Sequence, residues 1–172
     1  MRTSLLAAAA LATLTTAACK DKGKDGAPAA KTEGGAATKA APAAKAALEL
    51  PDFGLLIDAG KDAQVMDMTV GDTKTLMVQG EGLVVTVATV PADATFELAI
   101  EDAKMFSPTL NRQDKTADGW VLEYQNKGSM GDNFFVEIVR TVGGKRYKCS
   151  ATTPNKAQAE AGAAACQTLR TK

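Results

Sequence analysis

The sequence predicts an α+β domain with a single antiparallel β-sheet covered by helices, in the order strands, helix, strands, helix. Three observations lead to this fold class. Apolar and polar residues alternate in several short segments, as they do in strands with one buried face. Short connections rich in glycine join most of these segments, and such connections link antiparallel neighbours. Two further segments show the three- and four-residue spacing of amphipathic helices.

The part of the domain before the first helix contains four strand candidates, residues 53–58, 65–70, 75–79 and 83–90. The last candidate is apolar on both faces, so we expect it to lie centrally in the sheet with cover on each side. Three methionines, Met66, Met68 and Met77, could offer thioether ligands to Cu(I). Because the chain has no His and methionine commonly fills cores, we interpret them as packing residues.

Residues 91–108 predict the first helix. Thr95 is a suitable N-cap, a stripe of apolar residues follows it, and Pro108 ends the segment. The polar face of this helix carries three acidic residues, Glu97, Glu101 and Asp102. Paired carboxylates can perform acid–base chemistry, but in this position we interpret them as solvated charge.

Four more strand candidates follow the first helix, residues 111–116, 120–125, 133–142 and 145–152. We expect a longer loop at residues 127–132 and a two-residue turn at Gly143 and Gly144. Alternation places Trp120, Leu122 and Tyr124 on one face of their strand. An exposed Trp or Tyr would be a candidate for partner recognition, but the regular alternation favours core packing.

The second helix follows the last strand candidate. Thr153 can serve as its N-cap, with Pro154 at the first helical position. Its apolar stripe consists mostly of small residues, Ala159, Gly162, Ala163, Cys166 and Leu169. Cys149 on the last strand and Cys166 on this stripe face the same layer. We therefore predict a disulfide between Cys149 and Cys166 that staples the helix to the sheet.

Residues 1–18 have the layout of a secretory signal peptide, in which one positive charge precedes an apolar run too short to span a bilayer. The tail Thr16-Ala17-Ala18-Cys19 resembles the lipobox of bacterial lipoproteins, although Thr16 stands where the family usually has Leu. This resemblance implies that diacylglycerol is attached to the sulfur of Cys19, that cleavage occurs before it, and that the new amino terminus is acylated. Resemblance to the lipoprotein sorting pattern, with Lys20 rather than Asp after the cysteine, implies the outer rather than the inner membrane in bacteria that use that rule. An ordinary cleaved signal with a chance cysteine is the alternative.

Residues 19–47 are expected to form the lipidated cysteine and a disordered linker, because no large apolar residue occurs between Cys19 and Leu48. The globular domain is then expected to span residues 48–172. It carries 13 basic and 17 acidic side chains. This mildly acidic balance argues against a nucleic-acid-binding surface, which normally shows a basic stripe.

Over residues 48–172 the order of elements is similar to that of PsbP-like domains, which occur in an extrinsic photosystem protein, a Ran-binding import factor and small bacterial lipoproteins. The similarity includes the Asp-Gly-Trp start of the strand at Trp120. It also includes the strand with Gly144, Lys145 and Tyr147 that leads into a C-terminal helix. This resemblance implies a non-catalytic docking module and transfers no site residues.

The sequence shows no constellation of catalytic, metal-binding or cofactor-binding residues. It has no His, no Gly-x-Ser-x-Gly segment and no glycine-rich phosphate loop. We therefore predict a protein that is not an enzyme and needs no metal or cofactor. We expect it to dock on an envelope protein of unknown identity, while its lipid holds it at the membrane in the periplasm. Two alternatives stay open, an enzyme that uses carboxylate or serine chemistry and a carrier of a small apolar ligand.

Overall fold

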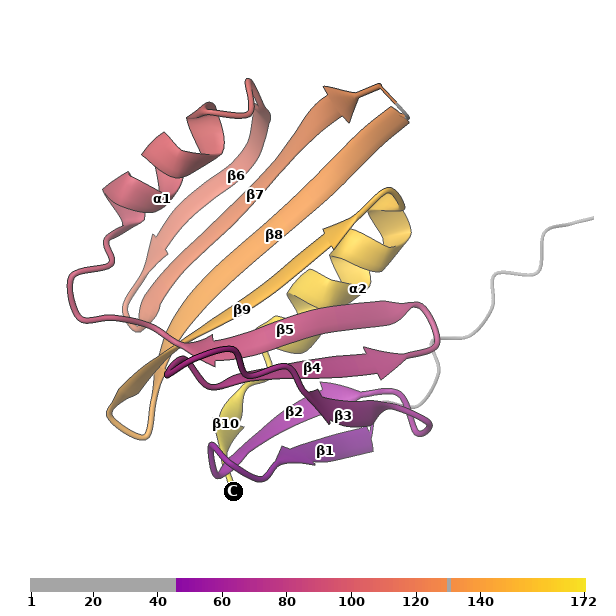
Figure 1. Cartoon of the computed structure of the whole chain (residues 1–172), viewed down its shortest axis with the longest axis vertical. Helices are drawn as coiled ribbons and strands as arrows, with labels where there is room; N and C mark the ends of the chain where they lie inside the picture. Colours follow the sequence, from indigo (N-terminus) through magenta and orange to yellow (C-terminus); the bar gives the residue numbers. More distant parts are fainter. Residues whose placement is uncertain (1–45, 130) are drawn as a thin grey trace, which may run out of the picture. The chain divides into compact units, whose positions relative to one another are not determined.

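The computed structural model describes residues 46–129 and 131–172 (Figure 1). Within these residues two helices, α1 (Phe96–Lys104) and α2 (Lys156–Cys166), accompany ten strands. The strands are β1 (Ala46–Leu50), β2 (Leu55–Ala59), β3 (Gln64–Asp67), β4 (Thr75–Gly80), β5 (Leu83–Thr89), β6 (Thr109–Thr116), β7 (Gly119–Gly128), β8 (Gly131–Val142), β9 (Lys145–Thr153) and β10 (Arg170–Thr171). In this part of the chain neither helix has the length and hydrophobicity that crossing a membrane requires.

The proposed signal peptide, Cys19 and nearly all of the linker lie outside the described residues. β1 begins at Ala46, slightly before the domain start expected at residue 48.

The prediction of a single antiparallel sheet covered by helices is wrong, because the strands form two sheets. The larger sheet has seven antiparallel strands in the order β3-β4-β5-β9-β8-β7-β6, and the smaller has three in the order β1-β2-β10. β2 pairs with β1 along one edge and with β10 along the other, so neither of its edges can join the larger sheet. The structure is therefore mostly β, and a second sheet supplies cover that the sequence analysis assigned to helices.

The main hydrophobic core lies on one face of the seven-stranded sheet, where the smaller sheet and α2 cover it (Figure 1). Buried side chains alternate along the strands, as Val85 and Val87 do on β5. Ile138 on β8 and Ile57 on β2 bring the two sheets into the same core. Removal of this apolar surface from water is the main force that holds the two sheets together.

α1 lies on the opposite face of the seven-stranded sheet and covers mainly β7 (Figure 1). A second, smaller core forms there from Ala103, Trp120, Leu122 and Val139. β5 is not covered on this side, since its side chains Val84, Thr86 and Ala88 are only half-buried. The expectation that residues 83–90 have cover on both faces is therefore wrong.

The β-hairpins agree with the predicted antiparallel order but differ in one connection. β7 and β8 pair up to Gly128 opposite Gly131, so the long loop expected at residues 127–132 is the end of a hairpin. Gly143 and Gly144 join β8 to β9 with φ angles of 59° and 77°. Side chains other than hydrogen are disfavoured at such angles, which confirms the predicted two-residue turn.

The two helices begin at capping residues, one of which differs from the prediction. Thr95 caps α1 as expected. α2 is capped by Asn155, whose side chain accepts hydrogen bonds from two backbone N–H groups of the first turn, whereas Thr153 still belongs to β9. Pro154 explains the difference, because a residue that precedes proline favours extended backbone.

The structure joins Cys149 of β9 and Cys166 of α2 by a disulfide, with their Cα atoms 5.5 Å apart. Both cysteines are fully buried. α2 approaches the sheet closely because Gly162 faces it, and a Cβ atom there would lie 3.2 Å from side-chain atoms of Ala151 and Val85. The other buried residues of α2 are alanines, which bury little area each. The disulfide thus compensates for limited apolar contact.

Loss of this disulfide is expected to lower the free energy of unfolding by about 3 kcal/mol, because the cysteines are 17 residues apart and their link restricts the unfolded chain. The variant Cys149→Ala/Cys166→Ala, and the parent protein in reductant, should therefore melt at a clearly lower temperature when followed by circular dichroism. Equal melting temperatures for the oxidised and reduced protein would contradict the stabilising role.

Arg140 on β8 ties the large sheet to the segment after α2. Its guanidinium donates a hydrogen bond to the carboxylate of Asp118 at 2.8 Å. It also donates to the backbone carbonyl oxygens of Gln167 and Leu169. The hydrogen bond from Arg140 lowers the pKa of the Asp118 carboxyl. One side chain therefore fastens two chain segments to the same strand.

Arg140→Met is expected to lower the free energy of unfolding by about 1–3 kcal/mol, because it removes charged hydrogen bonds. The pKa of Asp118 is lower in the folded state, so its contribution is present above the unfolded-state pKa of about 4 and is lost as the pH falls through the folded-state pKa. Denaturant unfolding at several pH values should show a difference between the two proteins that shrinks in acid.

A difference that stays constant with pH would argue against the contribution of Asp118. Lys156→Met is a matched control, because Lys156 forms only an exposed pair with Glu160 on α2. We expect it to change the stability very little.

Candidate functional site

The face of the seven-stranded sheet that carries α1 is covered only in part. The register of the strands gives two rows of neighbouring side chains on its uncovered part. The first row is Met66, Met77, Thr86, Ser150 and Glu137, from β3 to β8. The second row is Thr75, Ala88 and Lys148, from β4 to β9. The next residue across the sheet, Val139 on β8, belongs to the small core beneath α1. We call the surface formed by these two rows the open face.

α1 forms a wall beside the open face because its apolar stripe is anchored on β7. Phe96 and Ile100 pack against the small core that contains Trp120. Arg146 on β9 holds the segment before the helix, since its guanidinium donates hydrogen bonds to the carbonyl oxygens of Pro91, Ala92 and Ala94. The same guanidinium lies 5.1 Å from the centre of the Trp120 ring, a cation–π contact.

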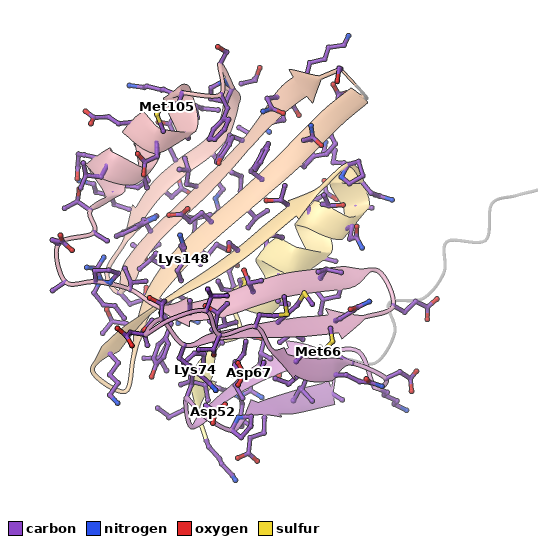
Figure 2. The ribbon with its side chains drawn as sticks, in the orientation of Figure 1. Asp52, Met66, Asp67, Lys74, Met105 and Lys148 are labelled. Atoms are coloured by element: carbon purple, nitrogen blue, oxygen red, sulfur yellow. A yellow bond between two sulfur atoms is a disulfide. The ribbon has the colours of Figure 1, made fainter. Side chains whose placement is uncertain are left out.

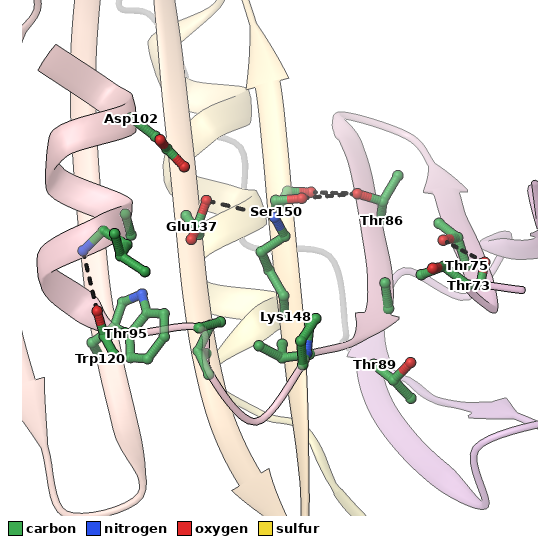
Figure 3. Close-up of a pocket in the computed structure, with 17 residues that line it drawn as sticks. Thr73, Thr75, Thr86, Thr89, Thr95, Asp102, Trp120, Glu137, Lys148 and Ser150 are labelled. Carbon is green, nitrogen blue, oxygen red and sulfur yellow. Dashed lines mark hydrogen bonds and ion pairs between the residues drawn. The ribbon is translucent and has the colours of Figure 1, made fainter. Parts of the chain in front are cut away.

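A cleft of about 570 Å³ lies between α1 and the open face (Figure 3). Its lining combines hydroxyl groups, charged groups and small apolar side chains, among them Thr86, Ala88, Glu137, Lys148 and Ser150 from the strands. α1 contributes Leu98 and Asp102, and the connection between β3 and β4 contributes Thr73. A volume of this size is typical of sites that hold small molecules.

The polar groups of the cleft are only loosely engaged with one another. Lys148 Nζ lies 3.8 Å from Glu137 Oε2, which is ion-pair distance but too long for a good hydrogen bond. The hydroxyl oxygens of Thr86 and Ser150 are 2.9 Å apart and form a hydrogen bond. Asp102 points from α1 toward Glu137 across the cleft (Figure 3). These groups therefore keep capacity to bind something else.

Trp120 lies at the base of α1, beside the cleft (Figure 3). Its side chain is well buried, as the sequence predicts, with 6% of the residue exposed. Among the described residues, its indole Nε1 is the one buried side-chain nitrogen or oxygen that lacks a hydrogen-bond partner. A buried donor without a partner costs free energy.

The pKa of Tyr124 reflects the negative charge on the α1 side of the cleft. Its ring stacks on Phe135, with ring centres 4.6 Å apart. Burial raises the pKa of Tyr124, and the negative charges of Glu137 and Asp102 raise it further. Two carboxylates thus act on the same region.

The three methionines Met66 on β3, Met68 directly after β3 and Met77 on β4 are not all packing residues. Met66 lies directly opposite Met77 on the open face, and Met66 and Met68 are 36% and 49% exposed. The interpretation of these two methionines as core residues is therefore wrong. Figure 2 shows Lys148 near the middle of the sheet and Met66 toward the β3 edge. The open face thus has a charged centre and an apolar margin.

Other residues that the sequence analysis considered do not meet in the cleft. The structure places Cys149 and Cys166 in the main core, and Cys19 lies outside the described residues. Glu97 pairs with Lys115 on the surface, so of the three acidic residues on α1 only Asp102 lines the cleft. In the part of the chain that the structure describes, no group of three or more His, Cys, Asp or Glu residues could hold a metal ion.

The sequence pattern did not reveal the polar residues of the cleft. Thr86, Glu137, Lys148 and Ser150 each stand at alternate positions of strands whose other residues are buried. That alternation marks them as facing away from the main core. The alternation does not indicate that these residues, which are distant in the chain, lie side by side across β5, β9 and β8.

The fold and the cleft define a two-sheet β protein with one partly uncovered sheet face. Comparisons of the chain with protein-family models, with curated proteins and with solved structures found no match. The resemblances to bacterial lipoproteins and to PsbP-like domains therefore stay predictions.

Proposed function

We propose that this protein is a non-catalytic interaction module of the bacterial cell envelope, held at the periplasmic side of the outer membrane by lipid on Cys19. We further propose that Met66 and Met68, which we call the methionine margin of the open face, contact an envelope protein. The observation that carries this proposal is the uncovered sheet face, whose β3 margin exposes Met66 and Met68.

Exposed apolar side chains at this margin favour contact with a protein. Met66 and Met68 are accompanied by the half-buried residues Met77 and Val84 on the neighbouring strands. Contiguous apolar surface on a domain often marks an interaction site. The flexible thioether of methionine adapts to different partner surfaces, which suits a docking role.

The composition of the cleft supports binding more than catalysis. The chain has no His to act as a base. The hydroxyl group of Ser150 is hydrogen-bonded to Thr86, and Lys148 lies beside a carboxylate. The cleft does hold two carboxylates, Glu137 and Asp102, as carboxylate chemistry would require. Among the described residues that line the cleft, none supplies a nucleophile held by a base, the usual sign of covalent catalysis.

The lipid anchor is tested by the variant Cys19→Ser. We expect the parent chain to incorporate radiolabelled palmitate and to fractionate with membranes, whereas the variant should lose the label and appear in the soluble periplasmic fraction. Two acyl signals on one residue give stable anchoring, so the difference should be large. A variant that is processed and fractionates just as the parent does would show that Cys19 is not the anchor.

The docking surface is tested by a photo-crosslinking amino acid in place of Met68 in the full-length chain. We expect a discrete adduct of higher mass in intact cells, and we expect the additional change Met66→Glu to abolish it, because a charge would have to be buried against the partner. The same crosslinker in place of Lys156, exposed on α2, is the matched control. Equal adducts at both positions, or none at Met68, would contradict the assignment of this surface.

A further inference from the structure

We propose that the cleft between α1 and the open face binds a free α-amino acid with an apolar side chain, with Asp102 and Glu137 at its ammonium group and Lys148 at its carboxylate. This inference does not rest on the proposed function, since the cleft and the methionine margin are different parts of the open face.

The charged groups of the cleft match both charges of such a ligand. Its lining contains two carboxylates, Asp102 and Glu137, and one ammonium group, that of Lys148. An α-amino acid carries its ammonium and carboxylate groups on the same carbon atom. The protein groups that bind them must therefore also lie close together, and Lys148 Nζ and Glu137 Oε2 are 3.8 Å apart. A longer peptide would separate its two terminal charges beyond such a pair.

The pair formed by Lys148 and Glu137 differs from the tight ion pairs of this protein. Lys74 Nζ lies 2.6 Å from Asp67 Oδ2, within hydrogen-bond distance (Figure 2). No hydrogen bond joins Lys148 to Glu137 in the described residues, although the side chain of Glu137 is only 24% exposed. Charged groups that are partly removed from water without strong partners gain most from a charged ligand.

Asp102 supplies the second carboxylate for the ammonium group. It lies on α1 one turn after Leu98, and it points toward Glu137 across the cleft (Figure 3). No Lys or Arg of the described residues lies within ion-pair distance of Asp102. The negative charges of both carboxylates raise the pKa of Tyr124. An ammonium group between them would be attracted by both charges.

The carboxylate end of the ligand would meet hydrogen-bond donors. Ser150 and Lys148 lie two residues apart on β9 and face the same side, and the hydroxyl groups of Ser150 and Thr86 are bonded to each other. Thr86 Oγ1 also lies within donating distance, 3.4 Å, of the Ser150 carbonyl oxygen, so the donor that remains for the ligand is the ammonium group of Lys148.

The apolar side chain of the ligand would contact apolar side chains that line the cleft. Leu98 on α1 is 50% exposed although it faces the cleft. Ala88 and Val90 line the same cleft from β5 and the segment that follows it. Contact with these side chains would remove apolar surface from water on both partners.

The test measures binding of L-leucine to the full-length mature protein by calorimetry and by fluorescence of its single tryptophan, Trp120. N-acetyl-L-leucine lacks the ammonium charge, L-leucinamide lacks the carboxylate, and N-acetyl-L-leucinamide lacks both. We expect saturable binding of L-leucine, and affinities lower by about tenfold or more for each derivative, because each loses charged hydrogen bonds.

Variants assign each end of the ligand to its residues. Lys148→Met should lower the affinity for L-leucine by about tenfold and leave the affinity for L-leucinamide unchanged. The double variant Asp102→Asn/Glu137→Gln should lower the affinity for L-leucine and leave the affinity for N-acetyl-L-leucine unchanged. Lys156→Met, on the other side of the sheet, should bind as the parent does. Circular dichroism of each variant would establish that it is folded.

Three results would overturn the proposal. The first is equal binding of L-leucine and N-acetyl-L-leucinamide, which would show that only apolar contacts matter. The second is binding of L-leucyl-L-leucine without binding of L-leucine, L-isoleucine or L-phenylalanine. The third is no binding of any of these amino acids up to about 10 mM, the range of very weak affinity. None of these results bears on crosslinking at Met68 or on fractionation of Cys19→Ser.

Discussion

The pairing of β5 with β9 holds the two halves of the large sheet together. Every other ladder of this sheet joins strands that follow one another in the chain, such as β3 with β4 or β7 with β8. β5 and β9 come from opposite sides of α1 and three further strands. On the core face their pairing sets Val87 beside Cys149, both fully buried, and Cys149 in turn holds α2. On the other face it sets Thr86 beside Ser150, so the same ladder assembles the floor of the cleft.

Local signals were enough to predict most of the strands and the first helix. Alternation located the strands from β3 to β9, and Thr95 indicated where α1 begins. The pairing of Cys149 with Cys166 followed from their positions on facing elements. The start of α2 was placed too early because Thr153 and Asn155 are both suitable N-caps. Pro154 decides between them by keeping Thr153 extended.

The division into two sheets and the position of the cleft could not be predicted in the same way. β1 lies at the end of an alanine-rich segment and β10 has two exposed residues, so neither has a marked apolar pattern. Which face of a sheet stays uncovered depends on where a helix docks, and α1 docks over β7 because Trp120 and Leu122 offer it an apolar surface. The residues of β5 carry the same alternation whether or not a helix lies above them.

The small sheet has a consequence for the order in which this protein can fold during synthesis. Leu56 of β2 pairs with Arg170 of β10, so one edge of an early strand is filled by residues that leave the ribosome much later. Until those residues have been synthesised, this edge of β2 presents unpaired N–H and C=O groups. Closure of so long a loop is also entropically costly and slow. During that interval the emerging chain carries an exposed strand edge on β2, and the small sheet can be completed only after residue 170 has left the ribosome.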